Sequence, residues 1–194
     1  QFYHTQCPEC GKTADLMYAF HVKKAKTNTS CKEHRFFSSF VIAYKKDEFT
    51  IVCPECGKLH MTKFQNGIFK CECGWKLHSP KDSYIKSGVF HCPHCEEEKL
   101  LSDYDIECGY PFDTDIVAIE YYCPNCHAHD YKAPDDQDIA LYHLACETYL
   151  QEKDNLPIPQ QAIPEGYNTK QIINHGYRYF KDLFNPRQLL CLGY

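Results

Sequence analysis

The spacing of the cysteines constrains this 194-residue chain more than any other feature of its sequence. Ten of its 14 cysteines fall in close pairs, four of the form C-x-x-C and one of the form C-x-C. The pairs are Cys7/Cys10, Cys53/Cys56, Cys71/Cys73, Cys92/Cys95 and Cys123/Cys126. Two cysteines this close rarely form a structural disulfide with each other, but their thiolates can share one tetrahedral metal ion. The pattern therefore predicts a fold held together by Zn²⁺.

Other features of the sequence favour metal over disulfides. The chain has no signal-like apolar start and no run of 18 apolar residues, so we expect a cytoplasmic protein with no membrane contact. Thiols stay reduced in that compartment. Leu, Ile and Val are modest in number, and small modules with thin cores need metal or disulfide staples. Because the chain starts at Gln1 and ends on an apolar run, we expect a fragment of a longer protein.

The order of the motifs predicts a small, metal-stabilised α+β fold. We expect tandem zinc ribbons made of short antiparallel β-hairpins, followed by an amphipathic helix and an extended C-terminal segment. The expected segments are a zinc-knuckle β module over 1–50, a central zinc ribbon over 51–87, a third zinc ribbon over 88–134, the amphipathic helix over 135–153, and a Pro-rich linker with a docking segment over 154–194.

Local signals place some elements within these segments. Residues 16–22 and 36–44 are rich in aromatic and β-branched side chains and are predicted strands. Asn66 and Gly67 form a hairpin-turn signal. Asn185 and Pro186 are typical of the N-cap and first residue of a helix.

The grouping of the cysteines follows from the four ligands that a structural zinc needs. The nearest groupings along the chain give two to three sites: Cys53, Cys56, Cys71 and Cys73; Cys92, Cys95, Cys123 and Cys126; and Cys7 and Cys10 with Cys31 and His34, which have C-x-x-H spacing. Such sites are coordinatively closed, so we expect no zinc catalysis.

An alternative grouping stays open. It joins Cys7/Cys10 to Cys53/Cys56 and Cys71/Cys73 to Cys92/Cys95, and leaves Cys123/Cys126 to His127 or His129. Three cysteines without a near partner are interpreted as small buried hydrophobic residues: Cys108, Cys146 and Cys191. Four histidines at no ligand spacing are interpreted as surface or structural residues: His60, His78, His94 and His143.

Two stretches near the C-terminus carry a family resemblance. Residues 158–166 read IPQQAIPEG, and residues 175–190 read HGYRYFKDLFNPRQLL. Together with the order of ribbons, helix and linker, they resemble large prokaryotic adenine-specific (amino-group) DNA methyltransferases that contain zinc ribbons. The resemblance implies that the ribbons are an insertion and that the final segment docks on the methylase core of the same polypeptide. The Asp-Pro-Pro-Tyr-like motif and the glycine-rich S-adenosylmethionine loop of that family are absent, so only the parent protein would bind S-adenosylmethionine and act as an enzyme.

Such an insert implies a function in DNA binding and target recognition. Residues 1–91 carry 14 Lys and Arg against 8 Asp and Glu, whereas residues 92–194 carry 7 against 18. The basic part supplies candidate contacts to the phosphates of double-stranded DNA: Lys23, Lys24, Lys26, Lys32, Arg35, Lys45, Lys46, Lys63, Lys70 and Lys76. Two alternatives compete with this interpretation. One is a protein-interaction module that docks subunits of a restriction-modification or phage-defence complex, and the other is a free-standing zinc-ribbon nucleic-acid-binding protein.

Overall fold

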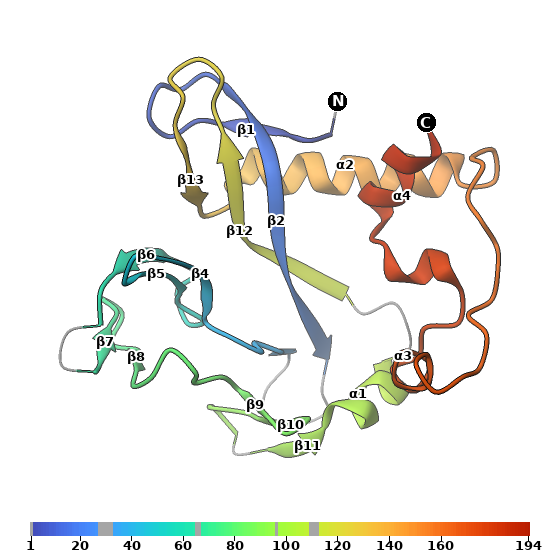
Figure 1. Cartoon of the computed structure of the whole chain (residues 1–194), viewed down its shortest axis with the longest axis horizontal. Helices are drawn as coiled ribbons and strands as arrows, with labels where there is room; N and C mark the ends of the chain where they lie inside the picture. The colour runs from blue at the N-terminus through green and yellow to red at the C-terminus, as the bar shows by residue number, and fades with distance from the viewer. Residues whose placement is uncertain (1, 27–32, 65–66, 96, 109–112) are drawn as a thin grey trace. The chain divides into compact units, whose positions relative to one another are not determined.

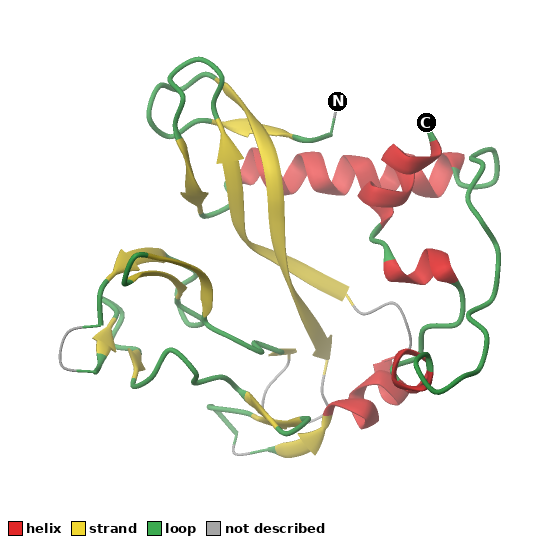
Figure 2. Cartoon of the chain, in the orientation of Figure 1, coloured by secondary structure: helices red, strands yellow, loops and turns green. Residues whose placement is uncertain are grey.

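The computed structural model describes residues 2–26, 33–64, 67–95, 97–108 and 113–194, with no side-chain description for residues 26, 105–108 and 113. The chain forms two compact units. The first comprises residues 1–2, 101–112 and 135–194 and is called the helical unit below. The second comprises residues 3–100 and 113–134 and is called the β unit. Figure 2 shows the helices and strands by colour, and all named strands belong to the β unit.

The largest sheet of the β unit is built around two long strands. Its strand order is β1-β2-β12-β13, and β3 also pairs with β2. The bounds are β1 His4–Gln6, β2 Thr13–Lys26, β3 Glu33–Arg35, β12 Asp113–Tyr122 and β13 His129–Lys132. Strands β2 and β12 run antiparallel, from Lys24 opposite Asp113 to Asp15 opposite Tyr122 (Figure 1). The strand predicted over residues 16–22 is confirmed, and its partner lies about a hundred positions away in the sequence.

Three smaller antiparallel sheets complete the β unit, with strand orders β4-β5-β6, β7-β8 and β9-β10-β11. Their bounds are β4 Val41–Lys45, β5 Glu48–Val52, β6 Leu59–Thr62, β7 Phe69–Lys70, β8 Lys76–Leu77, β9 Ile85–Lys86, β10 Val89–His91 and β11 Glu98–Leu100. These pairings confirm a small mixed α+β fold with antiparallel hairpins. The hairpin signal at Asn66 lies outside the described residues.

The strand predicted over residues 36–44 is wrong in its first half, because the ladder begins only at Val41. Phe36, Phe37 and Phe40 are all buried. Neighbours 36 and 37 cannot both face the core from a regular strand, since successive side chains point to opposite faces. The chain therefore leaves the extended form here, and hydrophobic burial decides its path.

A hydrophobic core joins the smaller sheets to the long strands. It contains Val22 of β2 and five other buried residues: Phe37, Phe40, Ile51, Val52 and Leu77. The Trp75 ring packs edge-on against Phe40, with ring centroids 5.0 Å apart. Trp75 is thus a packing residue of this core, since its ring already has an aromatic partner.

The helical unit contains five helical segments, α1 Leu101–Cys108, α2 Asp136–Glu152, α3 Lys170–Asn174, the 3₁₀ segment η1 Phe180–Leu183 and α4 Pro186–Gly193. The helix predicted over residues 135–153 is confirmed as α2, and Asp135 caps it by accepting from the backbone N–H groups of Gln137 and Asp138. Asn185 accepts from the N–H of Gln188 at 2.9 Å, which confirms the predicted start of α4.

The core of the helical unit lies between α2 and α4. Phe2, Ala145 and Leu190 are buried there, with Leu141 and Tyr149 packed against them. Arg187 of α4 is 2% exposed, and its guanidinium lies over the Tyr142 ring of α2 at 5.2 Å. Among the described helices, none has the length and apolar character needed to cross a membrane.

Candidate metal centres

Among the described residues, three groups of metal-ligating side chains gather in the β unit. The first centre comprises Cys7, Cys10, Cys123 and Cys126; the second comprises Cys53, Cys56, Cys71 and Cys73; the third comprises His34, Cys92 and Cys95. Within each group, the ligand atoms all lie within 4.8 Å of one another. Each group is therefore close enough to hold one metal ion.

Three of the C-x-x-C loops share one backbone turn. In the first loop, the Cys7 N–H donates to the Lys12 carbonyl at 2.8 Å, and the Gly11 N–H donates to the Cys7 carbonyl at 2.9 Å. The loops that begin at Cys53 and Cys123 repeat both bonds, at 2.8–2.9 Å. This turn brings two sulfurs to one side of a short loop, which is why the spacing alone predicts ligand pairs.

Backbone hydrogen bonds lower the pKa of some of these thiols, and burial raises the pKa of others. The Lys12 backbone N–H lowers the pKa of Cys10 to about 6, and the Lys58 N–H likewise lowers the pKa of Cys56. Burial raises the pKa of Cys53 and of Cys71. Each of the first two centres thus includes a thiol whose pKa is lowered by a backbone hydrogen bond, and the thiolate is the form that binds metal.

The first centre overturns the grouping predicted from the sequence. Cys7 Sγ lies 3.6 Å from Cys126 Sγ, and Cys10 Sγ lies 3.6 Å from Cys123 Sγ. Cys7 follows β1 and Cys123 follows β12, and the β2–β12 ladder carries these two loops to the same end of the sheet. The prediction that Cys7 and Cys10 group with His34 is therefore wrong. So is the prediction that Cys123 and Cys126 group with Cys92 and Cys95.

The second centre confirms the grouping predicted for the central segment. Cys53 Sγ lies 3.5 Å from Cys73 Sγ, and Cys56 Sγ lies 3.6 Å from Cys71 Sγ. Sequence reasoning missed a neighbour of this centre, because His60 Nε2 lies 3.2 Å from Cys71 Sγ. His60 is on β6, and its sequence signal is its position four residues after Cys56.

The third centre takes its histidine from β3 and its cysteines from the loop after β10. His34 is 2% exposed, its Nε2 lies 3.7 Å from Cys95 Sγ, and its ring packs on Phe90 with centroids 4.9 Å apart. Burial lowers the pKa of His34, which favours the neutral imidazole that ligates metal. Cys31, predicted to act with His34, lies outside the described residues.

Two of the predicted phosphate contacts are engaged in ion pairs. Lys24 Nζ and Arg35 Nη2 each lie 2.8 Å from a carboxylate oxygen of Asp115 on β12. Lys23 is half-buried, and neither the Lys26 side chain nor Lys32 is described. Five of the candidates are exposed and have no ion pair within the described part of the chain: Lys45, Lys46, Lys63, Lys70 and Lys76.

The charge imbalance between residues 1–91 and residues 92–194 does not correspond to the division into two units. The β unit carries 16 Lys and Arg against 15 Asp and Glu, and the helical unit carries 5 against 11. Strand β12 brings acidic residues back to the basic N-terminal part, as the Asp115 pairs illustrate. The net negative charge of the chain therefore resides in the helical unit.

The remaining cysteines differ from one another. Cys146 on α2 is half-buried, whereas Cys191 on α4 is exposed, so the interpretation of Cys191 as a buried hydrophobic residue is wrong. The side chain of Cys108 is not among those described.

Comparison of the chain with models of protein families, with curated proteins and with solved structures finds no match.

Proposed function

We propose that the three centres hold structural Zn²⁺ and that the β unit is a DNA-binding, target-recognition insert of an S-adenosylmethionine-dependent adenine-specific DNA methyltransferase. The insert itself performs no chemistry. The observation that carries the proposal is the division of the chain. All described metal-centre residues belong to the β unit, whereas residues 158–190, which resemble the methylases, belong to the helical unit.

Zinc is the metal that best suits these donor sets. Four thiolates, or thiolates with one imidazole, favour tetrahedral Zn²⁺ over the oxygen-seeking Mg²⁺ and Ca²⁺. Fully cysteinyl sites leave no open position for a substrate, which supports a structural role for the first and second centres. For the third centre, we propose Cys31 as the fourth ligand, because it precedes His34 by three residues in C-x-x-H spacing; the sequence alone predicts this pair to act with Cys7 and Cys10.

We propose that the insert docks on a methylase core through the 3₁₀ segment and the two residues that flank it. Tyr179, Phe180, Leu183 and Phe184 each leave 43–45% of their surface exposed. Exposed apolar clusters of this kind mark contact surfaces. They fall within the stretch that resembles the methylases, where such a contact is expected.

DNA contact is proposed for the exposed lysines of the smaller sheets. Lys70 on β7 lies directly opposite Lys76 on β8. Like charges at such positions are destabilising, and a phosphate group would relieve their repulsion. Lys45 and Lys46 lie at the β4–β5 turn, which adds two further cations. DNA methylases flip their target base out of the duplex, and separate contacts to the phosphates would hold the DNA in position during this step.

The test is the salt dependence of DNA binding. We expect the zinc-loaded chain to bind a fluorescent duplex, and the variant with Lys45, Lys46, Lys70 and Lys76 changed to Gln to bind more weakly. The slope of log K against log salt should fall by roughly 0.9 for each phosphate that the variant no longer neutralises. The matched control changes four other exposed lysines of the β unit: Lys12, Lys58, Lys81 and Lys86. Equal weakening in both variants, or no saturable binding, would contradict the proposal.

A further inference from the structure

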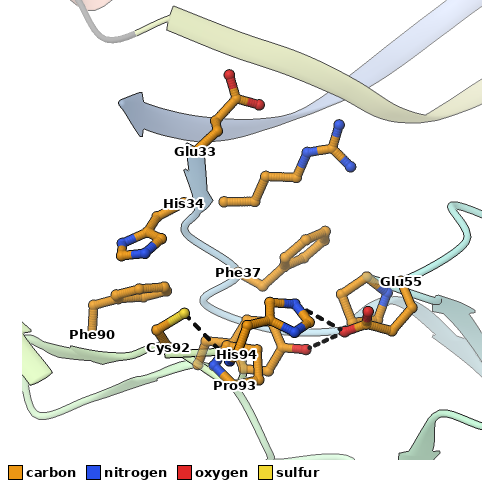
Figure 3. Close-up of a pocket in the computed structure, with 11 residues that line it drawn as sticks. Glu33, His34, Phe37, Glu55, Phe90, Cys92, Pro93 and His94 are labelled. Carbon is orange, nitrogen blue, oxygen red and sulfur yellow. Dashed lines mark hydrogen bonds and ion pairs between the residues drawn. The ribbon is translucent and has the colours of Figure 1, made fainter. Parts of the chain in front are cut away.

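A pocket opens between two of the metal-binding loops. The lining includes Pro54 and Glu55 of the second centre's loop and Pro93 and His94 of the third centre's loop. Figure 3 shows the Glu55 and His94 side chains next to each other in this lining. Its volume is about 260 Å³. This is just below the range of about 300–1,000 Å³ for pockets that hold drug-sized ligands, so the inter-knuckle pocket suits a small group.

The Glu55 carboxylate is held in place at this pocket. Its Oε1 accepts a hydrogen bond from the Tyr84 hydroxyl at 3.3 Å and lies 3.5 Å from His94 Nε2. Burial raises the pKa of the neighbouring Tyr84 hydroxyl, and the negative charge of Glu55 raises it further. Glu55 therefore presents a positioned negative charge.

The other charged residues of the lining cancel one another. Arg35 Nη2 lies 2.8 Å from Asp115, and Glu33 lies 3.7 Å from Lys24. Lys24 also lies 2.8 Å from Asp115, so two cations and two anions form one neutral cluster. Among the described lining residues, Glu55 is thus the charge that no lysine or arginine offsets.

The remaining lining combines apolar rings with two ligands of the third centre, His34 and Cys92. Phe37 and Phe90 are 3% and 1% exposed, and two proline rings flank them. Such walls reduce the local dielectric, which strengthens the attraction between a carboxylate and an entering cation.

We propose that the inter-knuckle pocket binds an organic cation, a guanidinium or alkylammonium group, with Glu55 as its counter-ion. The site is independent of the lysines proposed to contact DNA, so the two proposals succeed or fail separately.

The experiment titrates the zinc-loaded chain with two probes, spermidine and N-acetyl-arginine amide, by calorimetry. Binding of spermidine alone indicates a free polyamine as the source of the cation, and binding of the arginine amide indicates a protein side chain. Either result supports the site if Glu55→Gln weakens binding about tenfold. The matched control is Glu9→Gln, because Glu9 is the corresponding residue of the first loop and does not line the pocket.

Chemical-shift mapping on the unmodified chain provides a readout that does not depend on the variant's folding. Bound probe should shift the Tyr84 and His94 signals. No saturable binding of either probe, equal weakening by Glu55→Gln and Glu9→Gln, or shifts confined to other residues would overturn the proposal.

Discussion

At the residue scale, the C-x-x-C loops depend on one backbone conformation. In the loops that begin at Cys7 and Cys53, the residue after the second cysteine has a positive φ, 68° at Gly11 and 73° at Gly57. The fourth loop places His127 there, at φ 59°. Only glycine adopts this left-handed region without steric cost, while an ordinary side chain costs roughly 1–2 kcal/mol. The loop can thus accept another residue, but at a loss of stability.

This predicts the effect of substitutions at Gly57. Gly57→Ala should lower the free energy of unfolding by about 1 kcal/mol, because alanine disfavours a positive φ. Gly57→Asn is the matched control and should cost less, since asparagine tolerates this region. Denaturant unfolding of the zinc-loaded chain, followed by the fluorescence of its single tryptophan, Trp75, measures both. Equal stability of all three proteins would refute the role assigned to the turn.

Residue-level signals were also where sequence reasoning was strongest. The pairs Cys53/Cys56 and Cys71/Cys73 lie within 20 residues of each other, and their grouping followed from local order alone. The contact of His60 with Cys71 did not, because it depends on how β6 lies beside the metal-binding loop. Spacing along the chain reports neighbours within a turn, but not those supplied by an adjacent strand.

At the scale of elements, the pairing of β2 with β12 determines which cysteines form the first centre. The order of the cysteines in the sequence does not indicate this grouping. Cys7 and Cys126 are separated by 119 positions and meet because two long strands pair antiparallel. Both strands are rich in β-branched and aromatic residues, but many pairings would satisfy that pattern. Helix boundaries were easier to predict, because caps such as Asn185 act within one turn.

The cap of α4 gives a second prediction. Asn185→Ala should destabilise the helical unit by about 1 kcal/mol, because it leaves the Gln188 N–H without its side-chain acceptor. Thermal unfolding followed by circular dichroism at 222 nm would measure this loss. Asn174→Ala, at an exposed position in α3, serves as the control. Zinc content should stay unchanged, since the described ligands belong to the other unit; an unchanged melting curve would show that the cap contributes nothing.

At the scale of the whole molecule, metal binding and chain topology are linked. The chain enters the β unit near its start, leaves it for residues 101–112, and returns for residues 113–134. The first centre links the two chain segments of the β unit, since Cys10 belongs to residues 3–100 and Cys123 to residues 113–134. A metal ion there closes a loop of more than a hundred residues, and its binding free energy contributes directly to folding.

Counting zinc ions per chain by native mass spectrometry tests this account most directly. We expect three in the unmodified protein and two in the double variant Cys7→Ser/Cys126→Ser, because both residues serve the first centre. Cys53→Ser/Cys73→Ser, within the second centre, calibrates the loss of a single ion. If Cys7→Ser/Cys126→Ser instead retained only one zinc, these cysteines would belong to different centres, and the arrangement of metal centres described above would be contradicted.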